Sequence, residues 1–330
     1  MINKRFAILI LITLLLTAGI GCSRKNSEGN LFSKQKGEDP IPTEMYPGDY
    51  TQLAEYALDR GETDKALDYC REALKIDPDY AEAYYVIGMA NMINGNHDIA
   101  RDSFEKALDL DPQLTMAHAY LGSLYYSLGE YQESIKQFDM ILEKAKSFAL
   151  FNNHRGLAHL LRGNLDKAKQ DFDNAISKEP DDAAGYDNKA LVLLLQNRED
   201  DAKKLVEKAM EINPDLPGPY ESLGIIKILK GDYQTARGQL KKAIQTDNRV
   251  PLARYFLYYI EKKQGNPWEE TLQEALLADL KQSHEGLKVI EALSKHYRNS
   301  RLGQLSGEIH RDARKAEEKR LSNPPDTSAD

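Results

Sequence analysis

The sequence contains few of the residues on which catalytic and metal-binding sites commonly depend. Only two cysteines, Cys22 and Cys70, occur among its 330 residues, together with seven histidines. The two histidines closest in sequence, His154 and His159, lie about 140° apart around a helix and do not share a face. The HExxH, CxxC, GxSxG and phosphate-binding glycine motifs are all absent. We therefore predict a protein that is not an enzyme and that binds no cofactor or metal.

Positive charge is also scarce. The chain has 44 lysines and arginines against 52 aspartates and glutamates, a formal net charge of −8. A nucleic-acid-binding surface requires clustered Lys and Arg side chains to neutralise phosphates, so nucleic acid is not an expected partner. Hydrophobic residues at 41% and charged residues at 29% are typical of a globular chain.

The N-terminal apolar run is too short to be a typical membrane span. FAILILITLLL (6–16) follows Lys4 and Arg5 and leads through TAGIG to Cys22. This arrangement is typical of a secretory signal peptide. Gly21 followed by Cys22 resembles a bacterial lipobox, although Gly19 stands where that motif usually has an apolar residue. The resemblance implies cleavage before Cys22 and lipidation of its thiol, and an ordinary secreted or uncleaved leader is the alternative.

The N-terminal region is therefore expected to consist of a leader and an anchor. Residues 1–21 form the signal peptide, and 22–46 comprise the lipidated cysteine and a flexible tether, since 23–45 is polar and cannot bury a core. Ser23 rather than aspartate follows the cysteine, which favours the outer membrane of a bacterial envelope, facing the periplasm. Cys70 would then be the only free thiol, and we expect it to be a buried, inert side chain.

From residue 47 the sequence repeats every 34 residues for 204 residues without an insertion or deletion. Each repeat has small residues at positions 8 and 20 and Gly or Asn at position 15. We predict two helices per repeat, at positions 1–14 and 18–31, separated by the Gly/Asn turn and ended in most repeats by proline at position 32. The six repeats are 47–80, 81–114, 115–148, 149–182, 183–216 and 217–250.

This pattern, most complete in AEAYYVIGMANMINGNHDIARDSFEKALDLDP (81–112), is similar to that of the tetratricopeptide repeat (TPR) family. The resemblance implies an all-α, right-handed superhelical solenoid of antiparallel helix pairs that binds other proteins in its concave groove. Residues 251–320 are expected to form a degenerate repeat and capping helices, the last two near 284–297 and 301–320. Residues 321–330 are expected to be a disordered tail.

The concave groove can be read from the first helix of each repeat. Positions 4, 7, 8 and 11 are expected to face neighbouring helices, and in TPR proteins the stripe at positions 2, 5, 9, 12 and 13 lines the groove. The predicted peptide groove has an apolar floor and a polar or acidic edge. Its residues are Tyr85, Met89, Met92, Ser123, Tyr126, Asn153, Leu157, Leu160, Asp187, Leu191, Leu194, Glu221, Ile225 and Ile228.

An exposed apolar strip of this length indicates a binding site for a protein or peptide. We predict that an amphipathic helix or an extended apolar peptide docks across repeats four to six, and that a basic residue of the partner meets Asp187 or Glu221. A groove filled by the chain's own tail, or by a neighbouring copy, is the alternative.

These features together predict an envelope-anchored adaptor that binds partner proteins and helps to assemble a pilus or secretion complex. The lipobox and the number of repeats resemble those of the pilotins of type IV pili. An adaptor for peptidoglycan hydrolases or proteases is the first alternative. An enzyme within the C-terminal region is the second, and no catalytic constellation supports it.

Overall fold

The computed structural model describes residues 45–144, 148–247, 250–280 and 285–322. The predicted leader, Cys22 and all but the last two residues of the predicted tether lie outside this range. The chain divides into two compact parts, Met1–Leu124 and Tyr125–Asp330. We call these the N-terminal and C-terminal parts.

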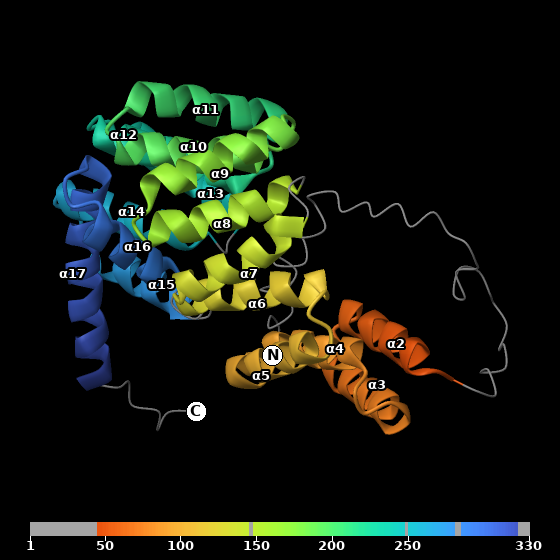
Figure 1. Ribbon diagram of the computed structural model, residues 1–330. Coiled ribbons are helices and arrows are strands. Elements are labelled where there is room, and N and C mark those ends of the chain that lie inside the picture. The colour runs from red at the N-terminus through yellow and green to blue at the C-terminus, as the bar shows by residue number, and fades with distance from the viewer. Residues whose placement is uncertain (1–44, 145–147, 248–249, 281–284, 323–330) are drawn as a thin grey trace, which may run out of the picture. The chain divides into compact units, whose positions relative to one another are not determined.

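The described residues form helices and no strand, which confirms the predicted all-α fold class. The first twelve helices come from the six repeats, two from each, and four further helices follow (Figure 1). In chain order they are α2 (Pro47–Asp59), α3 (Thr63–Ile76), α4 (Ala81–Asn94), α5 (His97–Leu110), α6 (Thr115–Leu128), α7 (Tyr131–Lys144), α8 (Ala149–Leu161), α9 (Leu165–Lys178), α10 (Ala183–Leu195), α11 (Glu199–Ile212), α12 (Pro217–Leu229), α13 (Tyr233–Thr246), α14 (Pro251–Lys263), α15 (Glu269–Leu280), α16 (Glu285–His296) and α17 (Arg301–Ser322).

The turn inside each repeat has the backbone conformation that position 15 predicts. Five of the six repeats place glycine there, with φ between +72° and +92°, and Asn197 has φ +57°. Glycine and asparagine tolerate this left-handed region at the end of a helix. Each second helix begins at position 17, one residue earlier than expected. The residue before proline, such as Asp77 or Asp111, is extended and ends the second helix.

The small residues at position 8 allow the two helices of a repeat to approach closely. A Cβ atom at Gly88 would lie 2.5–2.8 Å from ring atoms of Phe104, and one at Gly156 would lie 2.6 Å from the ring of Phe172. Both phenylalanines are fully buried. The aromatic ring of the second helix therefore fills the space that glycine leaves on the first.

A seventh helix pair follows the six repeats, and two more helices follow it. Gly265, between α14 and α15, again has a positive φ, of +71°. Asp279 accepts hydrogen bonds from the backbone N–H groups of Gly286 (2.7 Å) and Leu287 (2.9 Å), and so caps α16. The helices expected near 284–297 and 301–320 correspond to α16 and α17. The predicted tail begins too early, because α17 continues to Ser322.

Candidate functional site

The C-terminal helices α16 and α17 contact the ends of the first helices of repeats three to six. Lys288 of α16 donates a hydrogen bond to the carbonyl of Ser127, 2.7 Å away. Tyr297, between α16 and α17, donates its hydroxyl to the carbonyl of Leu160 at 2.5 Å. At Gly163 a Cβ atom would lie 2.8 Å from Nδ1 of His296. All these partners lie at or beside a turn between two helices of one repeat.

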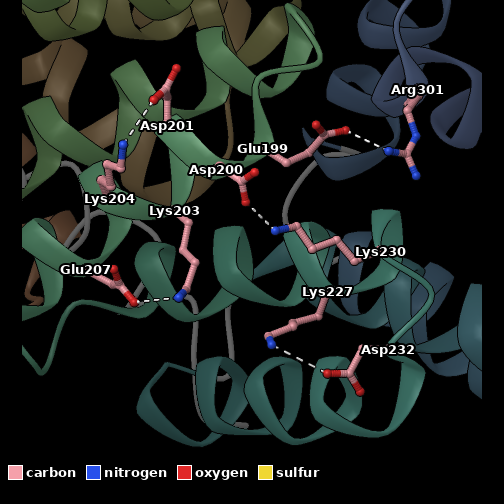
Figure 2. Close-up of polar contacts among 10 residues, drawn as sticks. All are labelled: Glu199, Asp200, Asp201, Lys203, Lys204, Glu207, Lys227, Lys230, Asp232 and Arg301. Atoms are coloured by element: carbon pink, nitrogen blue, oxygen red, sulfur yellow. Dashed lines mark hydrogen bonds and ion pairs between the residues drawn. The ribbon is translucent and has the colours of Figure 1, made fainter.

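Arg301, the first residue of α17, continues this series of contacts. Its backbone N–H donates to Oδ1 of Asn197 at 2.8 Å, and its guanidinium donates to the carbonyl of Leu229. The same guanidinium lies 2.9 Å from the carboxylate of Glu199 on α11, as Figure 2 shows. One residue thus attaches the start of α17 to α10, α11 and α12.

The contacts of α16 and α17 change the interpretation of the predicted groove floor. Leu160 and Leu194 are fully buried, and Ile225 and Ile228 are only 1% and 4% exposed. All four belong to the same hydrophobic core cluster as residues of α16, α17 and the turn between them, such as Leu293, Tyr297, Leu302 and Leu305. The expectation of an exposed apolar floor is therefore wrong at these four positions, because the chain's own C-terminal helices pack there.

Predicted groove residues of the N-terminal part are also less accessible than expected. Tyr85 and Met89 are 7% and 8% exposed, and the Tyr85 ring lies against those of Phe104 and Tyr120, at centroid distances of 6.3 and 5.6 Å. The hydroxyl of Ser123 donates to the carbonyl of Ala119 within its own helix. These side chains serve the packing of the repeats.

Among the predicted groove residues, six keep part of their surface exposed. The structure thus leaves accessible a subset that is more polar than the floor. The six are Met92, Tyr126, Leu157, Asp187, Leu191 and Glu221.

Asn153, Asp187 and Glu221 occupy position 5 of three successive repeats, on α8, α10 and α12. We call them the polar row. Burial raises the pKa of Asp187 to about 6, although the hydroxyl of Ser222 donates a hydrogen bond to it at 2.7 Å. Burial and the nearby charge of Asp187 raise the pKa of Glu221 to about 8, against the opposing effect of the Ala253 backbone N–H.

Two oxygen atoms of the polar row lack a hydrogen-bond donor. Asn153 is 4% exposed, and its Nδ2 donates to Asp182 at 3.0 Å, which fixes the orientation of the amide. Its Oδ1 is buried and has no partner, and neither has Oε2 of Glu221. Buried polar atoms are normally hydrogen-bonded, so each exception requires an explanation.

Other deeply buried carboxylates in this part of the chain have matched partners. Asp171 receives two hydrogen bonds from the guanidinium of Arg155, at 2.6 and 3.0 Å. Asp279 accepts from the hydroxyl of Tyr255 at 2.9 Å as well as from the two backbone groups of α16. The polar row is different, because the charge of Asp187 acts on Glu221 there and no described lysine or arginine acts on either acid.

The sequence offered one signal for the contact between α17 and the repeats. Position 15 is glycine in five repeats and asparagine only at Asn197, where the side chain accepts the hydrogen bond from Arg301. The turn conformation alone does not distinguish these two residue types. The contacts of Lys288 and Tyr297 go to backbone carbonyls, which no sequence pattern marks.

Metal and thiol chemistry can be considered for the described residues. No group of three or more His, Cys, Asp or Glu side chains among them could hold a metal ion. Cys70 is fully buried, as predicted, and burial raises the pKa of its thiol to about 12. None of the helices between residues 45 and 322 that the structure describes has the length and apolar character of a membrane span.

Comparisons with known proteins identify the repeats. The family model described as tetratricopeptide repeat matches residues 51–115, 94–149 and 153–217. A comparison with curated proteins finds no match.

Similar solved structures have the same fold. A tetratricopeptide repeat protein of Parabacteroides merdae aligns over 81% of this chain and 98% of its own, with a TM-score of 0.60 and 15% identity. The type IV pilus biogenesis factor PilW aligns over 62% and 94%, with a TM-score of 0.54 and 21% identity. PilF of Pseudomonas aeruginosa aligns over 61% and 92%, with a TM-score of 0.53 and 18% identity.

At these identities the solved structures establish the fold and nothing finer. Repeats of this kind generally serve as scaffolds for protein interaction rather than as catalysts, and no catalytic family matches. Together with the helix pairs, the turn conformations and the buried rings against Gly88 and Gly156, the family match shows that this chain carries tetratricopeptide repeats and folds as an all-α TPR solenoid.

Proposed function

We propose that the protein is an envelope-anchored scaffold that binds a partner protein and assists the assembly of a pilus or secretion complex. The stacked tetratricopeptide repeats carry this proposal, because such helix pairs present side chains of successive first helices to a partner. The similarity of fold to PilF and PilW agrees with a role in pilus assembly.

We further propose that the partner contacts the residues of the predicted groove that remain partly exposed. Leu157 and Leu191 supply apolar area, and Asp187 and Glu221 supply acidic groups. The buried floor residues are excluded from direct contact, because the C-terminal helices already pack against them. The partner surface is therefore expected to combine apolar and basic side chains.

The anchor in this proposal is a lipid on Cys22. Replacing Cys22 with alanine should move the protein from the membrane fraction to the soluble fraction or block removal of the leader. Cell fractionation and the mass of the purified protein measure both effects. Cys70→Ala is the matched control and should fractionate like the parent, since that thiol is buried. A Cys22→Ala protein that fractionates and migrates like the parent would contradict the anchor.

The scaffold role is tested by cross-linking the full chain in the envelope and identifying the attached protein. Capture of a pilus or secretion component that is lost in Leu157→Glu with Leu191→Glu supports the proposal. Peptidoglycan hydrolases or proteases as the captured partner would replace it with the alternative adaptor role. No specific capture by the parent protein would refute a scaffold function altogether.

A further inference from the structure

The polar row has an unusual combination of groups. Asn153, Asp187 and Glu221 follow one another at intervals of 34 residues and therefore lie at the same register on α8, α10 and α12. Apart from the Asn153 amide nitrogen, which donates to Asp182, these side chains offer two carboxyl groups and an amide oxygen. Asp187 and Glu221 are close enough for the charge of one to raise the pKa of the other.

Cations on the neighbouring helices are engaged elsewhere. Lys189, two residues after Asp187, lies 2.6 Å from Asp173. Lys227 of α12 lies 3.5 Å from Asp232. Arg254 of α14 donates to the carbonyl of Val250, and the acids that act on it are Glu274 and Asp247. No described lysine or arginine affects the pKa of Asp187 or of Glu221.

The unpartnered oxygens indicate which kind of group could bind beside them. Oδ1 of Asn153 faces α10, the helix that carries Asp187, since a Cβ atom at Gly185 would lie 3.7 Å from it. Glu221 holds one oxygen on the Ala253 backbone N–H and leaves Oε2 buried without a donor. Leaving such atoms unsatisfied is costly, and a buried charge without a counter-charge more so. A donor-rich cation between the two acids would satisfy Oε2 of Glu221 and balance their charge.

We propose that the polar row is a receptor site for a lysine or arginine side chain presented by a basic segment of the partner protein. Asp187 and Glu221 supply the counter-charge, and Oε2 of Glu221 is the free acceptor. A lysine ammonium brings three donors and an arginine guanidinium five, which matches a site made only of acceptors. This inference rests on the proposed function, because it names the chemistry by which the scaffold recognises its partner.

Asp187 and Glu221 both keep part of their surface exposed, whereas Oε2 of Glu221 and Oδ1 of Asn153 are buried, so a bound side chain has to enter beside the exposed parts of the two acids. Gly218 adjoins the Asp187 carboxylate so closely that a Cβ atom there would collide with its Oδ2. The absence of a side chain at Gly218 thus leaves the carboxylate its place in the row.

The test uses the full chain in a non-ionic detergent and a fluorescein-labelled peptide of alternating lysine and alanine, followed by fluorescence anisotropy at physiological ionic strength. The parent should bind this peptide and should not bind the same peptide with acetylated lysines. Asp187→Asn with Glu221→Gln should weaken binding about tenfold or more, because a desolvated ion pair is lost. Melting of this variant should be at least as high as the parent's, which shows that it folds.

The matched control removes the same two charge types from a solvated surface. Asp200 and Glu207 of α11 lie in exposed ion pairs with Lys230 and Lys203, as Figure 2 shows. Asp200→Asn with Glu207→Gln should leave the affinity for the peptide unchanged. Equal losses in both double variants would show that only net charge matters and would overturn the inference. Unchanged binding by Asp187→Asn with Glu221→Gln would overturn it as well.

Two further outcomes separate the inference from its premises. Millimolar calcium or magnesium chloride could displace the peptide from the parent at constant ionic strength. That result would assign the row to a metal and refute a lysine or arginine receptor. In the cross-linking experiment, capture that survives Asp187→Asn with Glu221→Gln would leave the scaffold function standing and remove this site. Loss of capture together with loss of peptide binding supports both the scaffold function and the receptor site.

Discussion

Leu194→Ala should destabilise the C-terminal part strongly, although the sequence places this residue on a binding surface. Leu194 is fully buried and belongs to the core cluster that includes α16 and α17. The substitution removes three carbon atoms, and at about 0.8 kcal/mol for each buried group the transfer term is about 2.4 kcal/mol. The cavity that remains raises the expected loss to about 3–5 kcal/mol.

The measurement is urea unfolding followed by the fluorescence of Trp268. This is the only tryptophan in the chain, and it lies in the C-terminal part, where its ring packs 5.5 Å from that of Tyr258. With a slope of about 2 kcal/mol per molar urea, a loss of 3–5 kcal/mol lowers the midpoint by about 1.5–2.5 M. Leu191→Ala is the control, because Leu191 is partly exposed and its truncation should cost less.

The result that refutes this reasoning is equally specific. If Leu194→Ala and Leu191→Ala lower the midpoint by the same small amount, the floor is open and α16 and α17 do not seal it in solution. In that case the original expectation of an apolar binding floor would be restored.

Three further predictions follow from single contacts. Gly156→Ala should cost about 1–3 kcal/mol in unfolding free energy because its Cβ would meet the Phe172 ring, whereas the exposed Gly238→Ala, with nothing within 4 Å, should gain about 0.5–1 kcal/mol by the Trp268 assay; equal effects would contradict the close packing. Asn197→Gly keeps the turn but removes the acceptor for the Arg301 N–H, so hydrogen exchange at the start of α17 should accelerate, and unchanged exchange would show that this contact is unimportant. Asp187→Asn with Glu221→Gln should remove a pH dependence: the folded-state pKa values of about 6 and 8 exceed the ordinary 3.8 and 4.5, so the parent loses stability as pH rises from about 4 to 8. The stability advantage of the double variant should therefore grow over that range, as thermal melts at each pH would show, and a constant difference would refute the raised pKa values.

The sequence predicted the repeats well because every feature of a repeat is local and is written six times. The left-handed turn at Gly61 or Gly95 and the close approach of Gly88 to Phe104 depend on residues within one repeat. Each is specified by a residue type that few alternatives can replace. The helix boundaries were accordingly correct to within one residue in the repeats.

The packing of α16 and α17 against the groove floor could not be predicted in the same way. It depends on contacts across 72 to 161 residues, such as those of Arg301 with Leu229 and of Lys288 with Ser127, and each occurs once. A leucine at position 12 is apolar whether it faces a partner or the chain's own helix, so Leu160 and Leu194 fit both arrangements. Polar groups are more informative, since the unpartnered oxygen of Glu221 requires an explanation that apolar packing does not supply.

The contacts of α17 with two groups of helices also determine which experiments can reveal the binding surface. Its first turn attaches to α10, α11 and α12 through Arg301, and its middle attaches to α14, where Tyr258 donates to Asp312 at 2.5 Å and Lys263 pairs with Glu308 at 2.8 Å. Deleting α16 and α17 would therefore remove the cap of the seventh helix pair and uncover Leu160 and Leu194 at the same time. New binding by such a truncated chain would reflect the exposed core as readily as a native groove. Substitutions in the polar row avoid this ambiguity, because neither acid takes part in the hydrogen bonds of Lys288, Tyr297 and Arg301 that attach α16 and α17.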